Sequence, residues 1–150
     1  MAGLVDNRKV WDRLKRELAR ANSLEVAVGL FSGKVNNKGK EVVEYAAYNE
    51  FGIGVPSRPF MSISFDENIS SINKIISEET SKILAGNSTV KASLGNIGKI
   101  HKDNIRNVIE NVNILPKLAD STVRKKKSTK TLIDTRALVD SVTYKVRKKS

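Results

Sequence analysis

The spacing of hydrophobic residues predicts a helix followed by a strand near the N-terminus. In residues 6–22 the apolar side chains of Trp11, Leu14 and Leu18 recur every three or four positions, as on one face of an amphipathic helix. Six Lys and Arg side chains lie on its other faces, where they are either solvated or available to a partner. From Leu24 to Phe31 apolar residues alternate with other residues, which predicts a strand with one buried face.

The middle of the chain predicts three further helices. Residues 41–51 have a helical pattern, and a longer apolar stripe runs to Ala85 from a start that is ambiguous between residues 60 and 66. A third helix is predicted over residues 89–112. Gly95 and Gly98 lie inside it, and each costs about 1 kcal/mol relative to Ala in a helix interior. The glycines therefore indicate either a close crossing with another helix or a break near residue 96.

The last third of the chain predicts short elements and a closing strand. Pro116 is typical of a first helical position, and a short helix is predicted from there to Arg124. A turn of helix is expected near residues 135–141, and alternating apolar residues over 142–146 predict a strand that pairs with strand 24–31. The sequence thus predicts an α+β fold, in which a small, mainly antiparallel sheet packs against several helices. We expect one domain over residues 1–150.

Residues 50–60, which we call the arch, form the most constrained segment of the sequence. Two glycines there permit backbone angles that other residues avoid, and two prolines three positions apart restrict φ. We expect Phe51 and Phe60 to anchor the arch to the core. Arg58 is expected either to face a partner or to brace the arch within its own subunit. The residues predicted to contact a neighbouring subunit or partner are Glu50, Phe51, Gly52, Pro56, Arg58, Pro59 and Phe60.

Positive charge is concentrated towards the C-terminus. The net charge is +11, and residues 101–150 carry 13 Lys and Arg against 5 Asp and Glu. Residues 124–130 hold five positive charges and nothing apolar, so we expect either a solvated loop or a contact with phosphates or an acidic surface. No aromatic residue interleaves with this run, which argues against base stacking. The candidate contact residues are Arg124, Lys125, Lys126, Lys127 and Lys130. Residues 147–150 are predicted to form a mobile basic tail.

The composition argues against several kinds of chemistry. The chain has no Cys and one His, so neither disulfides nor the usual structural zinc sites are expected. His101 lies in an apolar stripe without a suitably placed acid, and we expect it to be structural. Without a phosphate-cradling loop or a nucleophile arrangement, we predict a protein that is not an enzyme and binds no metal or cofactor. No apolar run reaches the roughly 18–20 residues that span a bilayer, so we expect no membrane partner. We expect the protein to be made in the cytoplasm.

Several motifs occur in an order and at a spacing that resemble one family. The motifs are Ala46-x-x-Asn49-Glu50-Phe51-Gly52, residues 53–60, a long helix, Leu118-x-x-x-Thr122-x-x-x-Lys126, and Leu132-Ile133-Asp134-Thr135-x-x-Leu138-x-x-Ser141-Val142. Over roughly residues 42–146 the chain resembles the tail-completion and virion-morphogenesis proteins of tailed bacteriophages. The resemblance implies a structural virion protein of the neck, without catalysis, that completes the tail end and joins the tail to the head connector. A head-side joining role is an alternative.

The resemblance also implies partners and a location. Copies of the chain are expected to form a ring, which we expect to be hexameric, around the DNA channel and in contact with other neck and tail proteins. Basic segments near the channel would meet the phosphates of the genome. The expected location is the virion, after assembly in the cytoplasm of the bacterial host. The family pattern usually has a glycine after the Asp-Thr pair, and Arg136 stands here instead. We therefore expect a different turn geometry there or an earlier helix start.

A second hypothesis follows from the charge alone. The surplus of positive charge and the run at residues 124–130 are typical of small basic proteins that bind nucleic acid without sequence specificity. This hypothesis predicts that the free chain binds duplex DNA and that the binding weakens steeply with salt.

Overall fold

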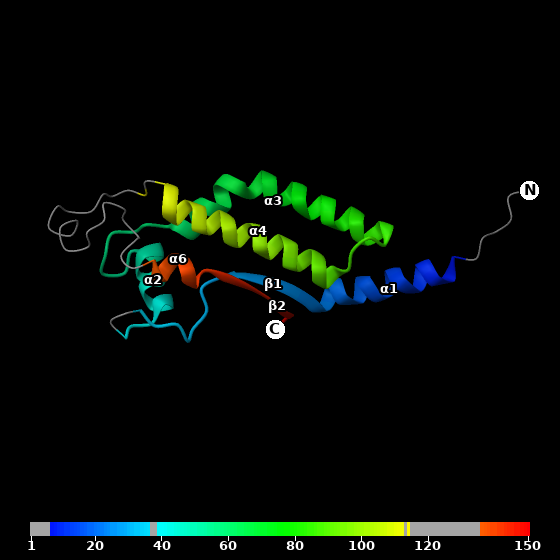
Figure 1. Cartoon of the computed structure of the whole chain (residues 1–150), viewed down its shortest axis with the longest axis horizontal. Coiled ribbons are helices and arrows are strands. Elements are labelled where there is room, and N and C mark those ends of the chain that lie inside the picture. The colour runs from blue at the N-terminus through cyan, green and yellow to red at the C-terminus, as the bar shows by residue number, and fades with distance from the viewer. Residues whose placement is uncertain (1–6, 37–38, 113, 115–135) are drawn as a thin grey trace, which may run out of the picture.

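Long helices and one pair of strands make up the structure, a computed structural model that describes residues 7–36, 39–112, 114 and 136–150 (Figure 1). In chain order its elements are α1 (Arg8–Ser23), β1 (Leu24–Gly29), α2 (Val42–Phe51), α3 (Phe60–Ala85), α4 (Val90–Asn111), α6 (Ala137–Ser141) and β2 (Thr143–Lys148). The predicted α+β class, with an antiparallel sheet packed against helices, is confirmed. The ambiguous helix start is resolved, because α3 begins at Phe60.

The sheet consists of β1 and β2, which pair antiparallel with Val26 opposite Val146. This confirms the predicted strand pairing. Helix α4 packs on the sheet and approaches it most closely at Gly98. A Cβ atom at this position would lie 2.6 Å from Cδ2 of Tyr144 and 2.7 Å from Cγ2 of Val26. Helix α4 runs without interruption through Gly95 and Gly98, so the expected break near residue 96 is wrong. The close contact at Gly98 is with the sheet and not with another helix, and a Cβ atom at Gly95 would meet nothing within 4 Å.

The hydrophobic core lies where α2, α6 and the start of α3 surround the C-terminal half of α4. Phe60 and Val142 are fully buried there. The buried apolar residues of this core are Val42, Ala46, Phe60, Ile105, Val108, Ile109, Ile114, Leu138, Val139 and Val142. As the low aromatic content suggests, aliphatic side chains fill almost all of it.

Helix α1 lies at the other end of the molecule and is held by polar contacts (Figure 1). Arg13 donates from Nη1 to the Ile83 carbonyl at 2.7 Å and from Nη2 to the Leu84 carbonyl at 2.9 Å. These bonds satisfy carbonyl groups of the last turn of α3, which lack partners within the helix. The buried carboxylate of Glu17 accepts from the Val90 amide at 2.8 Å, at the first residue of α4. One face of α1 therefore caps both helix ends at the α3–α4 turn.

The C-terminal segment differs from the prediction of a mobile basic tail. Strand β2 continues to Lys148, and the Lys149 amide donates to the Ser23 carbonyl at 2.9 Å. Arg147 pairs with Glu25 across the two strands, with 2.8 Å between Nε and Oε1. The prediction is wrong for residues 147–149, because pairing with the start of β1 satisfies their backbone.

Arg136 adopts a left-handed backbone conformation immediately before α6. Its φ and ψ are 61° and −2°, and it is the residue before the first helical position, Ala137. Glycine adopts this conformation without the steric cost that a Cβ atom brings. The expectation of an earlier helix start is therefore wrong, because α6 begins at Ala137 and Arg136 itself takes a conformation that glycine favours. The Arg136 guanidinium also pairs with Glu110 of α4.

Candidate subunit-interface site

The arch begins where Gly52 ends α2. Gly52 has a φ of 71°, in the left-handed region, and the Ile53 amide donates to the Tyr48 carbonyl at 3.0 Å. A Cβ atom on Gly52 would lie 3.0 Å from the Cβ of Ser57, so the two sides of the arch are in close contact. The Ser57 hydroxyl donates to the Glu50 carbonyl at 3.0 Å. Backbone angle and close packing thus both require glycine at position 52.

Glu50 connects the end of α2 to the start of α3. Its buried carboxylate accepts from the Met61 amide at 2.9 Å, the Ser62 amide at 3.0 Å and the Ser62 hydroxyl at 2.7 Å. These amides belong to the first turn of α3, where N–H groups lack partners within the helix and the helix dipole favours a negative charge. Pro59, the residue before α3, makes no side-chain capping bond. Glu50 therefore acts as the cap of α3 from a neighbouring helix.

Arg58 is buried inside the arch, with 7% of its surface exposed. Its amide donates to the Asn49 carbonyl at 2.6 Å, and its Nη1 lies 3.5 Å from the Pro56 carbonyl oxygen. Within one chain the arch closes over this side chain, and a contact of Arg58 with a partner stays a prediction. The geometry favours the alternative, in which Arg58 braces the arch within its own subunit.

The two phenylalanines at the ends of the arch have opposite environments. Phe60 is fully buried, as expected, whereas Phe51 is 73% exposed. The prediction that Phe51 anchors the arch to the core is therefore wrong, because this last residue of α2 points out of the fold. Ile53 and Val55 are exposed beside it in the sequence. The arch thus presents apolar side chains on a backbone that internal hydrogen bonds hold in place.

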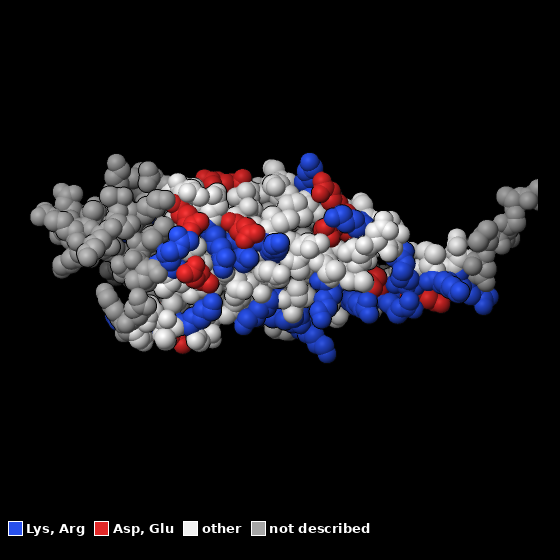
Figure 2. All heavy atoms as spheres, in the orientation of Figure 1, with Lys and Arg blue, Asp and Glu red and all other residues white. Residues whose placement is uncertain are grey.

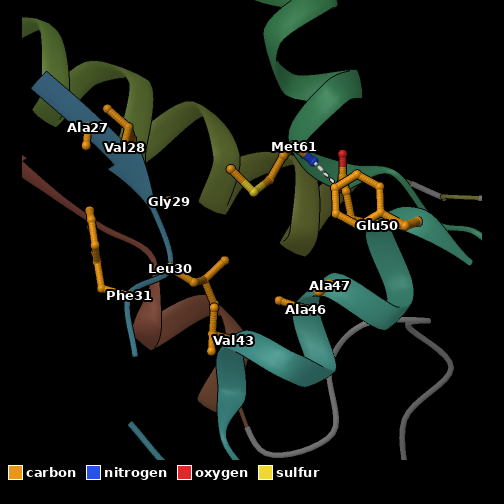
Figure 3. A pocket seen from close by; sticks show the side chains of 11 residues that line it. Ala27, Val28, Gly29, Leu30, Phe31, Val43, Ala46, Ala47, Glu50 and Met61 are labelled. Atoms are coloured by element: carbon orange, nitrogen blue, oxygen red, sulfur yellow. Dashed lines mark hydrogen bonds between the residues drawn. The ribbon is translucent and has the colours of Figure 1, made fainter. Parts of the chain in front are cut away.

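A shallow apolar pocket adjoins the arch (Figure 3). It has a volume of about 230 Å³ and lies between the end of β1 and helix α2. Figure 3 shows Met61 and Leu30 on either side of it and the hydrogen bond between the Met61 amide and Glu50. The residues that line it are Ala27, Val28, Gly29, Leu30, Phe31, Val43, Ala46, Ala47, Glu50, Phe51 and Met61. Apart from Glu50, which caps α3, these side chains offer apolar contacts and no reactive group.

The predicted basic contact residues Arg124, Lys125, Lys126, Lys127 and Lys130 lie outside the described residues. The same holds for the predicted helix that starts at Pro116 and for the motif residues from Leu118 to Thr135. A different concentration of positive charge is visible along α1 and the sheet (Figure 2). Its exposed members include Lys15, Arg16 and Arg20 of α1 and Lys145, Arg147, Lys148 and Lys149 at the C-terminus. We call these seven residues the basic band.

His101 belongs to α4 and is half-buried where this helix packs against α3. Its ring centroid is 6.0 Å from that of Phe65, and burial lowers the pKa of the imidazole below its ordinary value of 6.5. In the part of the chain that the structure describes, no three His, Cys, Asp or Glu side chains gather closely enough to bind a metal ion. None of the described helices is both long and apolar enough to cross a membrane.

The sequence did not reveal two features of helix α1. The capping contacts of Arg13 and Glu17 join residues about 70 positions apart, and no local pattern marks them. The exposure of Trp11 and Leu18 was missed as well, because an amphipathic stripe does not show what covers it.

Comparisons of the chain with protein-family models, with curated proteins and with solved structures found no match.

Proposed function

We propose that this chain is a structural subunit of the neck of a tailed bacteriophage. In this role, copies of the chain form a ring that completes the tail end and joins it to the head connector around the DNA channel. Other neck and tail proteins are its partners, and the virion is its location. The motifs around the arch and in residues 118–142, which resemble the tail-completion and virion-morphogenesis proteins, support the proposal.

The observation that carries the proposal is the exposed apolar surface of a rigid arch. Burying an apolar side chain such as Phe51 or Ile53 contributes about 1.5–3 kcal/mol. Both are exposed, while Glu50, Ser57 and Arg58 hold the arch by contacts within the chain. A preformed surface loses little conformational entropy when it binds, so the arch is suited to a contact between subunits. Contacts of one surface with a different surface of the next copy generate rings when the rotation closes.

The proposal is tested on the purified chain and on phage particles. Light scattering after size exclusion and negative-stain electron microscopy should show rings for the wild type. The double variant Phe51→Ser, Ile53→Ser should remain monomeric, with the same melting temperature as the wild type at a concentration where the wild type is also monomeric. Val35→Ser, which changes an exposed apolar residue outside the arch, is the control and should assemble normally. In a phage that encodes the chain, deletion of its gene should leave tails unjoined to heads, and normal particles would refute the proposal.

The basic band favours a second candidate function, the sequence-independent binding of nucleic acid. Figure 2 shows Lys and Arg side chains gathered along α1 and the sheet, where the basic band lies in the sequence. Glu25 pairs with Arg147, and Lys145 lies over the Phe31 ring with its Nζ 4.3 Å from the centroid. Such a band would contact a duplex through phosphates, with release of counterions. Bases need not be read for this kind of binding.

Fluorescence anisotropy with a labelled DNA duplex tests this second candidate. The logarithm of the binding constant should fall linearly with the logarithm of the salt concentration, with a slope of about 0.9 for each phosphate neutralised. Replacing Lys145 and Lys148 by Ala should reduce that slope, whereas Lys74→Ala, on the exposed face of α3, should not. Absence of binding by the free chain at low salt would refute this function and leave the ring proposal untouched.

A further inference from the structure

Helix α1 leaves an apolar groove open at its end of the molecule. Trp11 is 61% exposed and Leu18 is 63% exposed, although both belong to the apolar stripe of the helix. With Ile83 and Leu84 of the α3–α4 turn they line a cavity of about 320 Å³. Exposed apolar surface of this kind, rimmed by charge, is typical of an interaction site.

The groove is preformed. The bonds from Arg13 to the carbonyls of Ile83 and Leu84, and from the Val90 amide to Glu17, fix α1 against the α3–α4 turn. Helix α1 is therefore already fixed on its own chain, and its exposed apolar side chains are not covered by a further movement of the helix. An occupant of the groove must supply apolar side chains from elsewhere.

The charges around the groove indicate what that occupant is. Helix α1 carries six Lys and Arg against two Asp and Glu, a net charge of +4. Residues 41–85, which contain the arch and the helices on either side of it, carry seven Asp and Glu against three Lys and Arg, a net charge of −4. The arch also exposes the apolar side chains Phe51, Ile53 and Val55. A second copy of this chain therefore offers a surface that matches the groove in both charge and hydrophobicity.

One copy cannot make this contact with itself. Helix α1 lies at one end of the molecule, and the arch lies beside α2 at the other (Figure 1). We propose that the arch of one copy docks into the α1 groove of the next. This inference rests on the proposed ring and names the two surfaces that build it. The contact joins different surfaces, so an open chain of copies has one free groove at one end and one free arch at the other until the ring closes.

Two complementary variants test the inference by light scattering and native mass spectrometry. The groove variant is Trp11→Ser, Leu18→Ser, and the arch variant is Phe51→Ser, Ile53→Ser. All four side chains are exposed, so circular dichroism should show both variants folded. Val10→Ser, an exposed apolar change on α1 outside the groove, is the matched control and should assemble like the wild type.

Each variant alone should be monomeric, and a 1:1 mixture should give dimers and nothing larger. The intact arch of the groove variant binds the intact groove of the arch variant, and the two spoiled surfaces block growth. Monomers in the mixture would overturn the inference, because they would show that arch and groove do not bind each other. A groove variant that still forms rings, while the arch variant does not, would overturn the inference and leave the proposed function standing. A monomeric wild type would overturn both.

A charge-reversal pair gives an independent reading. Arg16→Glu on α1 and Glu44→Lys on α2 should each weaken assembly, and the loss should be smaller at high salt. The double variant should recover assembly at low salt if the two regions face each other. If the double variant does not recover assembly, Arg16 of one copy does not face Glu44 of the next.

Discussion

Replacing Gly98 with Ala should destabilise the protein, whereas Gly95→Ala in the same helix should stabilise it. A Cβ atom at position 98 would lie 2.6 Å and 2.9 Å from ring carbons of Tyr144 and 2.7 Å from Cγ2 of Val26. Carbon atoms rest about 3.5–4.0 Å apart, so α4 would have to move away from the sheet. At position 95 no described atom would lie within 4 Å of the new Cβ.

The size of the two effects follows from two opposing contributions. Replacing Gly by Ala within a helix contributes about 1 kcal/mol of stability. Overpacking a filled site costs about 1–3 kcal/mol, and contacts with a ring and a β-branched side chain place Gly98 near the upper end. We therefore expect Gly98→Ala to lose about 2 kcal/mol and Gly95→Ala to gain about 1 kcal/mol. At about 2–4 °C per kcal/mol, their melting temperatures should differ by roughly 6–12 °C.

Urea denaturation followed by far-ultraviolet circular dichroism measures both free energies of unfolding. The wild type and the two variants must be compared at one protein concentration, because assembly adds to apparent stability. If both variants gained about 1 kcal/mol, α4 would not lie this close to β1 and β2. If both variants lost stability, helix propensity would not determine the effect at position 95.

Three further predictions concern polar side chains that the structure places. Glu50→Ala should cost about 2–3 kcal/mol, because the first turn of α3 loses charged hydrogen bonds, whereas the exposed Glu44→Ala should be nearly neutral in urea denaturation. Arg13→Leu should cost about 1–2 kcal/mol because α1 loses its two charged hydrogen bonds to the end of α3, and Arg16→Leu, its exposed neighbour on α1, should cost less. Burial lowers the pKa of His101 in the folded state, so the unfolded chain binds more protons below about pH 6.5. Stability should therefore fall as the pH drops through that value, and His101→Gln should lose this part of the pH dependence in denaturation curves measured from pH 7.5 to 5.

The sequence was sufficient for the parts of the fold that depend on local periodicity. Alternation around Val26 and Val146 predicted both strands, and their pairing followed because apolar faces of this kind must be covered together. Gly98 was recognised as costly in a helix, which indicated a close helix crossing as one of two alternatives, whereas the close neighbours are Tyr144 and Val26 of the sheet. A helical stripe and a strand alternation are repeated many times, so a single misplaced residue does not hide them.

Side-chain directions at the ends of elements could not be predicted in this way. Phe51 was given the wrong environment, inside the fold, and for Arg58 the sequence left an outward and an internal position open. The direction of Phe51 depends on where α2 ends, which Gly52 determines. The burial of Arg58 depends on how the arch closes, which Glu50 controls by capping α3 from a distance of eleven residues. Such contacts involve single residues far apart in sequence and leave no periodic signal.

Polar contacts within the chain position both candidate surfaces, while the apolar side chains on those surfaces are exposed. Stability and assembly should therefore respond to different residues. Arg58→Ala should lower the free energy of unfolding by about 2 kcal/mol, because a buried side chain that braces the arch is lost. The Phe51→Ser change should leave stability nearly unchanged and weaken assembly, because this side chain is exposed within one copy.

Urea denaturation at a concentration where the chain is monomeric, combined with light scattering at a higher concentration, separates these two effects. If Arg58→Ala assembled poorly with an unchanged free energy of unfolding, Arg58 would contact a neighbour directly. The arch would then open on binding, because a side chain that is 7% exposed must turn outward to reach another copy. A loss of stability with assembly restored at lower temperature would instead assign Arg58 to the internal brace, and Phe51 to the contact that the brace supports.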